Sequence, residues 1–289
     1  MKQVRPKKNL GQHFLTDLSI AKRIADTVDE PYGELPVLEV GPGMGVMTQY
    51  LMKKPRPFKV VEIDKESVAY LKGTLFREYL ETVPAEQATF HITPIIEGDF
   101  LRMDLTHVFE GSQFVLTGNY PYDISSQIFF KMLDNRDLIP CCTGMIQHEV
   151  AVRMAAKPGN KQYGILSVLI QAWYDVEYLF TVEPSVFNPP PKVQSAVIRM
   201  TRNAVQHLGC DEQLFKRLVK TVFNQRRKML RVSLKQLLSA DALSALNARL
   251  TEQSTLLSLT LRPEQLTIEQ FVELTNLVEQ EMTREETKC

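Results

Sequence analysis

The chain has 289 residues and no net charge, and its 44% hydrophobic and 24% charged residues are typical of a folded protein with one large domain or a large and a small one. Its four cysteines form no CxxC pair and its five histidines no HxxxH pattern, which argues against a disulfide framework and against a metal site built on these residues. No apolar run approaches the roughly 20 residues that span a bilayer, and the N-terminus lacks the apolar part of a secretory signal, so a soluble cytoplasmic protein without membrane contact is expected.

Short β-rich runs alternate with helical patterns from residue 36 onwards. Helices are predicted at 44–54 and 65–81. Strands are predicted at 36–41, 58–64, 93–100, 113–120, 141–148, 176–183 and 195–202. This alternation predicts an α/β fold with a mostly parallel sheet that is covered on both faces. Since ligands bind at the carboxyl ends of the strands in such sheets, the residues that follow each strand are the first candidates for a site.

The pattern changes near residue 203, after which only helices are predicted. They cover 211–223, about 226–239, 241–250 and 263–281. Pro263 is acceptable in a first helical turn, but Thr267 and Gln270 have the spacing of a capping box, so the last helix begins at one of these two places. The change predicts a first domain over residues 1–205, with the basic N-terminal segment, and a small helical domain over 206–289.

A glycine-rich turn follows the first strand, in the segment EVGPGMG. Gly41, Gly43 and Gly45 allow a sharp turn and a close approach of the backbone to a ligand. Glu62 ends the next strand, where a carboxylate is placed to bind ribose hydroxyls. The dinucleotide pattern GxGxxG has its third glycine five residues after the first, and here the interval is four. This spacing favours S-adenosylmethionine over a nicotinamide cofactor.

Two further polar groups follow the next strands. Asp99, in the segment EGD, is placed to accept a hydrogen bond from the adenine amino group of such a cofactor. Alone it would indicate only a turn. The fourth strand ends in Asn119-Tyr120-Pro121-Tyr122.

The NYPY segment suits methylation of an adenine amine. This nitrogen is a poor nucleophile, because its lone pair is delocalised into the ring. The side-chain oxygen of Asn119 and the backbone carbonyl of Tyr120 are expected to accept its two hydrogens and to favour tetrahedral geometry, which is electrostatic preorganisation without a strong base. Pro121 stiffens the turn, and Tyr122 offers a face on which the base stacks.

Together these segments resemble the small-subunit (16S) ribosomal RNA adenine dimethyltransferases. The resemblance rests on LGQHFL at 10–15, EVGPGMG at 39–45, VEID at 61–64, EGD at 97–99, NYPYDIS at 119–125 and FNPPPKVQSAV at 187–197. It extends from about residue 7 to the RPEQLTIEQFVEL segment. The resemblance implies a Rossmann-like class I methyltransferase domain with a small helical C-terminal domain. It also implies dimethylation at N6 of two adjacent adenosines in a 3′-terminal hairpin loop, with the immature small subunit as partner and a monomeric enzyme.

The resemblance also implies cofactor contacts at His13 and Leu15, beside those at Gly41, Gly43, Glu62, Asp99 and Asn119. Two departures from the family pattern occur. Some relatives have Asn where His13 stands, so the resemblance leaves the form of this contact open. The second position of the NYPY motif is often Leu or Ile, but Tyr120 is expected to be tolerated, because the role assigned to it belongs to the backbone.

Phe187 precedes three prolines and Lys192. A proline run fixes an extended loop, so Phe187 is expected to cover the face of the target base opposite Tyr122. The alternative is a structural loop with a buried phenylalanine. Lys192 either contacts RNA phosphate or only solvates the loop.

Basic residues are concentrated in parts of the chain, although the total charge balances. Residues 211–240 carry eight basic side chains against two acidic ones. On a continuous helix, Lys216, Lys220, Arg227, Arg231 and Lys235 share one stripe, for which phosphate contact is favoured over a solvated face. A break near Asn224 would change this geometry. The residues expected to contact RNA are Lys7, Lys8, Lys192, Arg226, Arg227, Lys228, Arg231 and Lys235.

Three other functions are compatible with parts of the sequence. One is the large-subunit ribosomal RNA methyltransferase family that confers macrolide resistance, which shares the GQHFL and NxPY patterns but fits the PPPKV and RPEQL segments less well. A non-catalytic ribosome-assembly or transcription factor on the same scaffold would be free to lose Gly41, Glu62 or Asn119, all of which are present. A nicotinamide-dependent dehydrogenase conflicts with the glycine spacing.

Overall fold

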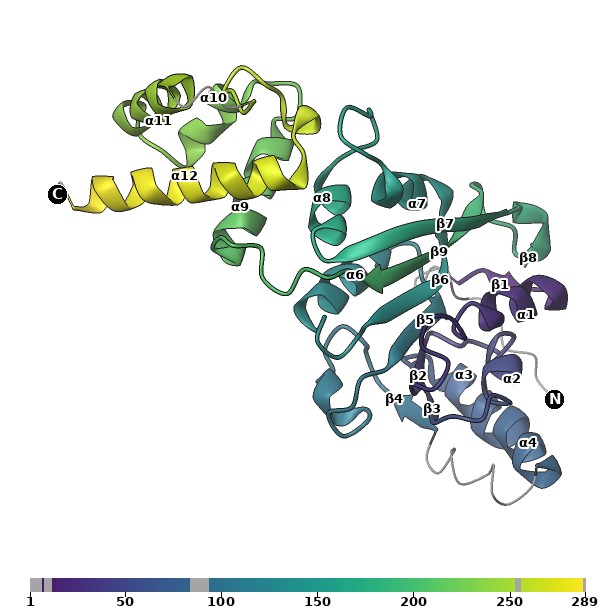
Figure 1. Ribbon diagram of the computed structural model, residues 1–289. Coiled ribbons are helices and arrows are strands. Elements are labelled where there is room, and N and C mark those ends of the chain that lie inside the picture. Colours follow the sequence, from purple (N-terminus) through teal and green to yellow (C-terminus); the bar gives the residue numbers. More distant parts are fainter. Residues whose placement is uncertain (1–6, 8–11, 84–93, 253–255, 288–289) are drawn as a thin grey trace. The chain divides into compact units, whose positions relative to one another are not determined.

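A computed structural model of the chain describes residues 7, 12–83, 94–252 and 256–287. The chain forms two compact units, each made of two separate segments (Figure 1). The first comprises Met1–Ala151 and Val176–Arg202, and the second comprises Val152–Asp175 and Asn203–Cys289. Among the described residues, no helix is both long enough and apolar enough to cross a membrane.

Seven strands form one sheet in the order β4-β3-β2-β5-β6-β9-β7. They are β2 (Val37–Val40), β3 (Phe58–Glu62), β4 (Ile95–Glu97), β5 (Val115–Asn119), β6 (Cys141–Gln147), β7 (Tyr174–Val182) and β9 (Ser195–Arg202). The strands β2 to β6 run parallel, and β9 is antiparallel to β6. Every residue of β2 is buried, as a central strand with both faces covered requires. The predicted strands and the mostly parallel sheet are confirmed.

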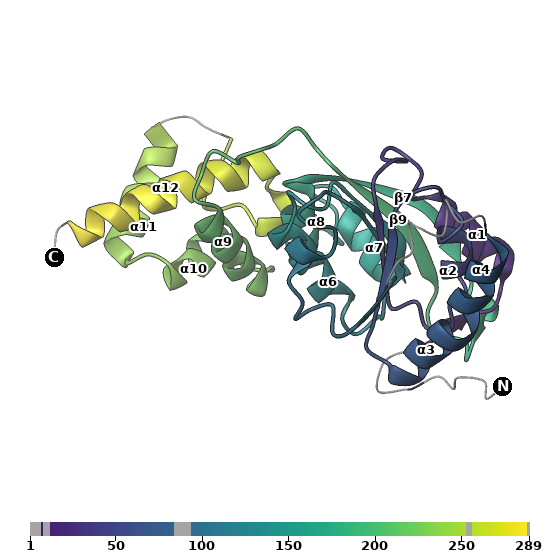
Figure 2. The same ribbon diagram turned by 90° about the horizontal axis from the view of Figure 1, so that it is seen from below.

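Helices cover both faces of this sheet. Figure 2 shows α1 and α4 on one face and α6 on the other. The helices that alternate with the strands up to β6 and directly after it are α1 (Leu18–Asp26), α2 (Thr48–Leu51), α3 (Lys65–Tyr70), α4 (Phe76–Thr82), α6 (Ser125–Asp134) and α7 (His148–Ala155). Asp17 begins α1, because its carboxylate accepts hydrogen bonds from the backbone N–H groups of Ser19 and Ile20. Short 3₁₀ turns lie at Leu105–His107 and Pro184–Val186.

The helix predicted over 65–81 contains a π-helical turn, Leu71–Leu75, between α3 and α4. This turn places Leu71 and Leu75 directly over Gly45. A Cβ at Gly45 would lie 2.3 Å from Leu75 Cδ2 and 3.1 Å from Leu71 Cδ2. The third glycine of the turn after β2 therefore allows this helix to pack against the turn.

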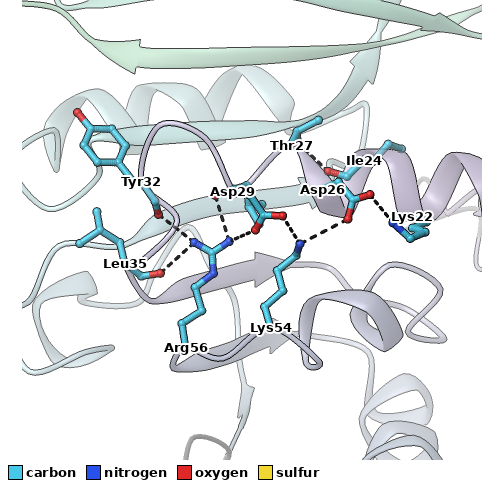
Figure 3. Close-up of polar contacts among 10 residues, drawn as sticks. Lys22, Ile24, Asp26, Thr27, Asp29, Tyr32, Leu35, Lys54 and Arg56 are labelled. Carbon is cyan, nitrogen blue, oxygen red and sulfur yellow. Dashed lines mark hydrogen bonds and ion pairs between the residues drawn. The ribbon is translucent and has the colours of Figure 1, made fainter.

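Arg56 fixes the loop that joins α1 to β2 (Figure 3). Its side chain is only 2% exposed. The guanidinium donates to the backbone carbonyls of Val28, Tyr32 and Leu35 at 2.9–3.3 Å and to Asp29 Oδ1 at 2.8 Å. Since the buried guanidinium faces the inner side of this largely exposed loop, one side chain pairs three backbone carbonyls at once.

Two very short strands, which the sequence analysis did not predict, pair outside the main sheet. They are β1 (Phe14–Leu15) and β8 (Phe187–Asn188), and they run antiparallel with Leu15 opposite Phe187. This pairing joins the N-terminal segment to the segment before β9. Two residues are too short for any alternation of polar and apolar side chains, so no sequence pattern marks such strands.

Aromatic side chains from both segments form the core of the second unit. Trp173 packs edge-on against Phe215 at 6.0 Å, and Tyr163 packs against Phe223 at 6.1 Å. The helices of this unit are α8 (Ile165–Gln171), α9 (Glu212–Asn224), α10 (Leu230–Ser233), α11 (Ala240–Glu252) and α12 (Ile268–Glu286), with 3₁₀ turns at Leu234–Gln236 and Pro263–Gln265. The last helix begins after Thr267, which forms the capping box with Gln270, so this predicted start is confirmed.

The basic stripe does not lie on one continuous helix. The helix α9 ends at Asn224, a turn follows, and α10 begins at Leu230. The N–H groups of Leu230 and Arg231 donate to the carbonyls of Leu261 and Leu259, so the backbone bonds to a distant segment instead of to the preceding turn. This tertiary contact overrides the local helical pattern. The break near Asn224, which the sequence left open, is present, so Lys216 to Lys235 do not share one stripe.

Candidate active site

A cavity of about 280 Å³ lies at the carboxyl ends of β2, β3, β4 and β5. With the exception of Phe187, every residue predicted to bind the cofactor or to act in catalysis lines it: His13, Leu15, Gly41, Gly43, Glu62, Asp99, Asn119, Tyr120, Pro121 and Tyr122. Those from Gly41 onwards come together because the strands that they end or follow are neighbours in the sheet and end at the same edge, and β1 adds His13 and Leu15 from the N-terminal segment.

The glycine-rich turn forms one wall of this cavity. All three glycines have positive φ, with values of 66° at Gly41, 56° at Gly43 and 78° at Gly45. At Gly43 a Cβ would also lie 3.0 Å from the Phe14 ring. The conformation and the close contact both require glycine here, which leaves the backbone N–H of Gly43 accessible as a donor.

Glu62 is held by backbone donors on both of its oxygens. Oε2 accepts from Gly43 N at 3.0 Å, and Oε1 accepts from Asp64 N at 2.8 Å. The residue is 4% exposed, and burial raises the pKa of its carboxyl. Its orientation is therefore fixed before any ligand arrives, and the remaining lone pairs are free to accept hydroxyl hydrogens.

The sequence analysis missed a second buried acid in this wall. Glu39 lies on β2, is 2% exposed and lines the cavity. Thr48 Oγ1 donates to its Oε2 at 2.7 Å. Burial, with a smaller repulsion from Glu62, raises the pKa of Glu39 to about 8, so the group is protonated at neutral pH. An acid inside the apolar strand VLEV was the available signal.

Glu39→Gln is expected to flatten the pH dependence of stability. The folded-state pKa of about 8 lies above the pKa of about 4.5 of an unfolded glutamate, so stability is full at low pH and is lost as the pH rises towards 8. Between these values the free energy of unfolding should fall by up to about 1.4 kcal/mol per pH unit in the wild type relative to the variant. Urea unfolding at pH 5.5, 6.5 and 7.5 measures the difference. Parallel profiles would contradict it, and Glu177→Gln, at a half-exposed acid, is the control.

Asp99 occupies the turn after β4. Its Oδ1 accepts from Leu101 N at 2.9 Å, and its Oδ2 lies 3.4 Å from Arg102 Nε. The first contact fixes the carboxylate, while the second involves an exposed arginine that can move aside. Ile63, after β3, also lines the cavity although it is 53% exposed, and it was not predicted as a site residue. An exposed apolar residue at a cavity is suited to the face of a ligand ring.

Asn119 lines the cavity, and one end of its amide is already bonded. Its Nδ2 donates to the backbone carbonyl of His13 at 3.3 Å. Because the nitrogen end is engaged by the N-terminal segment, Oδ1 is the end that remains to accept a hydrogen bond from a ligand. The same contact connects the NYPY turn to the segment that contributes His13 and Leu15.

Tyr120 presents its backbone to the cavity, since its side chain is 1% exposed. The hydroxyl lies 3.2 Å from Cys142 Sγ and donates to the carbonyl of Thr143 at 3.1 Å. Gly144 makes room for the ring, because a Cβ there would lie 2.7 Å from Tyr120 Cε2 and 2.3 Å from the carbonyl oxygen of Gly118. The chain thus accommodates tyrosine at this position behind the turn.

Tyr122 is held at its hydroxyl and at one face. The hydroxyl shares a hydrogen bond of 2.5 Å with Ser195 Oγ. The His13 ring stacks on it with 5.7 Å between centroids and 26° between planes. Burial raises the pKa of the phenol, so Tyr122 is neutral in the working pH range.

Phe187 does not reach the cavity. It is 4% exposed and belongs to the hydrophobic core of the first unit. The sequence analysis placed it in an extended loop with its ring opposite Tyr122. Instead its pairing with Leu15, as part of β8, turns the ring into the core. The segment FNPPPKVQS meets the site through other residues.

The family profile described as "Ribosomal RNA adenine dimethylase" matches residues 3–280. The chain belongs to this family. Ribosomal RNA small subunit methyltransferase A of Bacteroides fragilis is 63% identical over 280 residues, covering 97% of this chain and 94% of that protein. The protein of the same name from Porphyromonas gingivalis is 54% identical over 281 residues, covering 97% and 100%.

Solved structures show the same fold. A dimethyladenosine transferase from Plasmodium falciparum has a TM-score of 0.71 and 24% identity, covering 93% of this chain and 98% of that chain. The 23S rRNA methyltransferase ErmE has a TM-score of 0.62 and 24% identity, covering 92% and 99%. The fold is therefore that of the class I methyltransferases, with a helical C-terminal part.

Membership of the rRNA adenine dimethylase family decides among the alternatives. The chain is an S-adenosylmethionine-dependent rRNA adenine dimethyltransferase, which excludes the dehydrogenase. The likeness to a large-subunit enzyme extends to the fold alone, whereas small-subunit enzymes are 54–63% identical. Every site residue that a non-catalytic factor would be free to lose is present in the cavity, including Gly41, Glu62 and Asn119.

An rRNA adenine dimethylase also needs contacts to its RNA. Lys7 is engaged elsewhere, because its Nζ lies 2.7 Å from Asp64 Oδ1 and 3.1 Å from Glu66 Oε1. It anchors the start of the N-terminal segment to α3. Lys8 lies outside the described residues. Lys192 is exposed between β8 and β9.

The basic residues after α9 fall into two groups. Arg226 is half-buried, and it donates to the carbonyl of Asn160 at 3.3 Å with Glu264 at 4.0 Å, so it joins parts of the protein to one another. The others are exposed and, within the described part of the chain, take part in no ion pair: Arg227, Lys228, Arg231 and Lys235. They form a basic surface over the turn at 225–229, α10 and the 3₁₀ turn that follows.

Proposed function

We propose that the enzyme dimethylates N6 of two adjacent adenosines in the 3′-terminal hairpin loop of 16S rRNA. Its substrate is the immature small ribosomal subunit, and it acts as a monomer in the cytoplasm. The observation that carries this proposal is the state of Asn119, which lines the cavity with its amide nitrogen already engaged, beside a fixed acid, Glu62. Residues 1–205 would perform the methyl transfer, and residues 206–289 would contribute RNA contacts.

The polar and apolar groups that line the cavity are suited to the parts of S-adenosylmethionine. Glu62 would accept the ribose hydroxyls, and Asp99 would accept the adenine amino group. Ile63 would cover a face of the adenine, and the backbone of Gly41 and Gly43 would lie against the amino-acid end. When bound, the cofactor supplies an electrophilic methyl group on sulfur. Its positive charge is complementary to the acids of this site.

Asn119 and Tyr120 would act on the target amine. The side-chain oxygen of the first and the backbone carbonyl of the second would accept the two amine hydrogens, so that the nitrogen lone pair leaves the ring system and points at the methyl group. Both acceptors are fixed before the base arrives, which is the condition under which such contacts stabilise a transition state. The base would stack on the face of Tyr122 that His13 leaves open.

Glu62→Ala is expected to weaken S-adenosylmethionine binding by about 2–3 kcal/mol, or roughly 30- to 150-fold, because a charged acceptor for the ribose hydroxyls is lost. Calorimetry measures the affinity. Glu78→Ala, which removes the same charge from an exposed position on α4, is the control and should bind normally. An unchanged affinity in Glu62→Ala would place the cofactor elsewhere.

Replacing Arg227, Arg231 and Lys235 together with Gln is expected to weaken RNA binding and to flatten its salt dependence. Each lost phosphate contact removes close to one unit of slope in log affinity against log salt. Filter binding to small-subunit RNA across a salt series provides the slope. The variant Lys22→Gln, Lys53→Gln, Arg77→Gln changes the charge equally at exposed sites of the first unit and should keep the wild-type slope. An unchanged slope in the first variant would remove the basic surface from the interface.

The function itself is tested by incubating the enzyme with labelled S-adenosylmethionine and RNA, and by mapping the methylated adenosines with mass spectrometry. Immature small subunits and the naked RNA are compared side by side. In the subunit, we expect two neighbouring adenosines near the 3′ end to be dimethylated. On naked RNA, we expect little product. Modification of large-subunit RNA alone would contradict the proposal.

A further inference from the structure

The hydroxyl of Ser195 is buried and forms a hydrogen bond with the hydroxyl of Tyr122. Ser195 is the first residue of β9, is 0% exposed and lies opposite Gln147 of β6, so its backbone is fixed by the sheet. Its Oγ lies 2.5 Å from the Tyr122 hydroxyl. The short distance and the rigid strand make Ser195 a fixed point to which a side chain on the NYPY turn is tied.

The same segment of chain supports Tyr122 at a second point. The carbonyl of Pro189 lies 2.8 Å from Nδ1 of His13. The ring of His13, held in this way, stacks against Tyr122. The phenol is therefore restrained at its hydroxyl by Ser195 and at its face by His13, and both restraints originate between β8 and the start of β9.

We propose that Ser195 is a positioning residue for Tyr122 and sets the plane of the ring on which the target adenine stacks. Without it, the Tyr122 ring would be restrained at its face by His13 alone, and its plane would be less well fixed at each transfer. In this way the proline-rich segment between β8 and β9 contributes to the site through Ser195, although Phe187 in the same part of the chain does not reach the cavity. The inference rests on the proposed stacking role of Tyr122.

A double-mutant cycle tests this. Ser195→Ala and Tyr122→Phe remove the same hydrogen bond from its two ends, and Tyr122→Phe keeps the ring. Each should lower kcat/KM for RNA by about 3- to 10-fold, the effect of one hydrogen bond. The double variant should lose no more than the larger single loss, and S-adenosylmethionine affinity should stay unchanged in all three. If Ser195 served only the packing of β9, its loss would add to that of Tyr122→Phe.

A second readout follows the base itself, without methyl transfer. RNA carrying 2-aminopurine at the target position should lose fluorescence when it stacks on Tyr122, and the loss should be smaller in both single variants. The variant Tyr122→Ala separates the positioning role of Ser195 from the stacking role of Tyr122. If Tyr122→Ala abolishes quenching and activity while Ser195→Ala and Tyr122→Phe match the wild type, the positioning role is overturned and the stacking role stands. If Tyr122→Ala keeps both, the stacking role fails as well. Should Ser195→Ala not fold, Tyr122→Phe alone decides, because a wild-type result in it refutes the proposal.

Discussion

Asn119→Ala is expected to reduce methyl transfer by about 100-fold or more, while S-adenosylmethionine affinity stays within an order of magnitude of the wild type. The variant removes a preorganised acceptor that acts on the target amine in the transition state. The amide is already aligned by its bond to the His13 carbonyl, so no reorientation is needed during the reaction. Single-turnover transfer to RNA at saturating cofactor measures the first quantity, and calorimetry measures the second.

The matched control is Asn135→Ala. Asn135 is the residue after α6, and its Nδ2 donates to the carbonyl of Lys131, which resembles the bond that Asn119 makes. Its replacement should leave the transfer rate unchanged. Near-normal turnover in Asn119→Ala would remove the role assigned to this side chain.

Arg56→Met is expected to lower the free energy of unfolding by about 3–5 kcal/mol, because the carbonyls of Val28, Tyr32 and Leu35 lose their buried donor. The lost ion pair adds little, since Asp29 is half exposed. Methionine keeps most of the volume, so the change reports polar contacts more than packing. Urea unfolding at neutral pH provides the measurement.

Lys22→Met is the control for this effect, since it breaks an ion pair in the same group (Figure 3). Lys22 Nζ lies 2.6 Å from Asp26 Oδ2, but the two side chains are 61% and 46% exposed. Water already solvates both ends, so the unfolding transition should stay at its wild-type position. An Arg56→Met protein as stable as the wild type would mean that the loop carbonyls find other partners.

Much of the active site could be predicted because the fold gathers it by a simple rule. Gly41, Glu62, Asp99 and Asn119 each follow or end a strand of one parallel sheet, and the ends of neighbouring strands meet. Local patterns therefore sufficed to place residues that lie far apart along the chain. The alternation of strands and helices could be predicted for the same reason, since it depends on periodicity within each short segment.

The features that the sequence analysis missed depend on contacts between distant segments. The ring of Phe187 is buried because β8 pairs with β1, and the two strands are too short to leave a pattern. The break near Asn224, which the sequence left open, arises where Leu230 and Arg231 bond to carbonyls near residue 260. The high pKa of Glu39 comes from burial, which only the folded protein creates. Propensity and spacing describe none of these interactions.

The second unit is made of two segments, which matters for anyone who shortens this enzyme or exchanges parts between relatives. A fragment that stops at residue 205 keeps Trp173 and Tyr163 but lacks Phe215 and Phe223, on which they pack. Roughly 300–500 Å² of aromatic surface would then lose its cover, enough to make such a fragment prone to aggregation. The helical C-terminal region alone would lack the complementary rings. A chimaera that preserves this core must carry residues 152–175 together with residues 203–289 from the same parent.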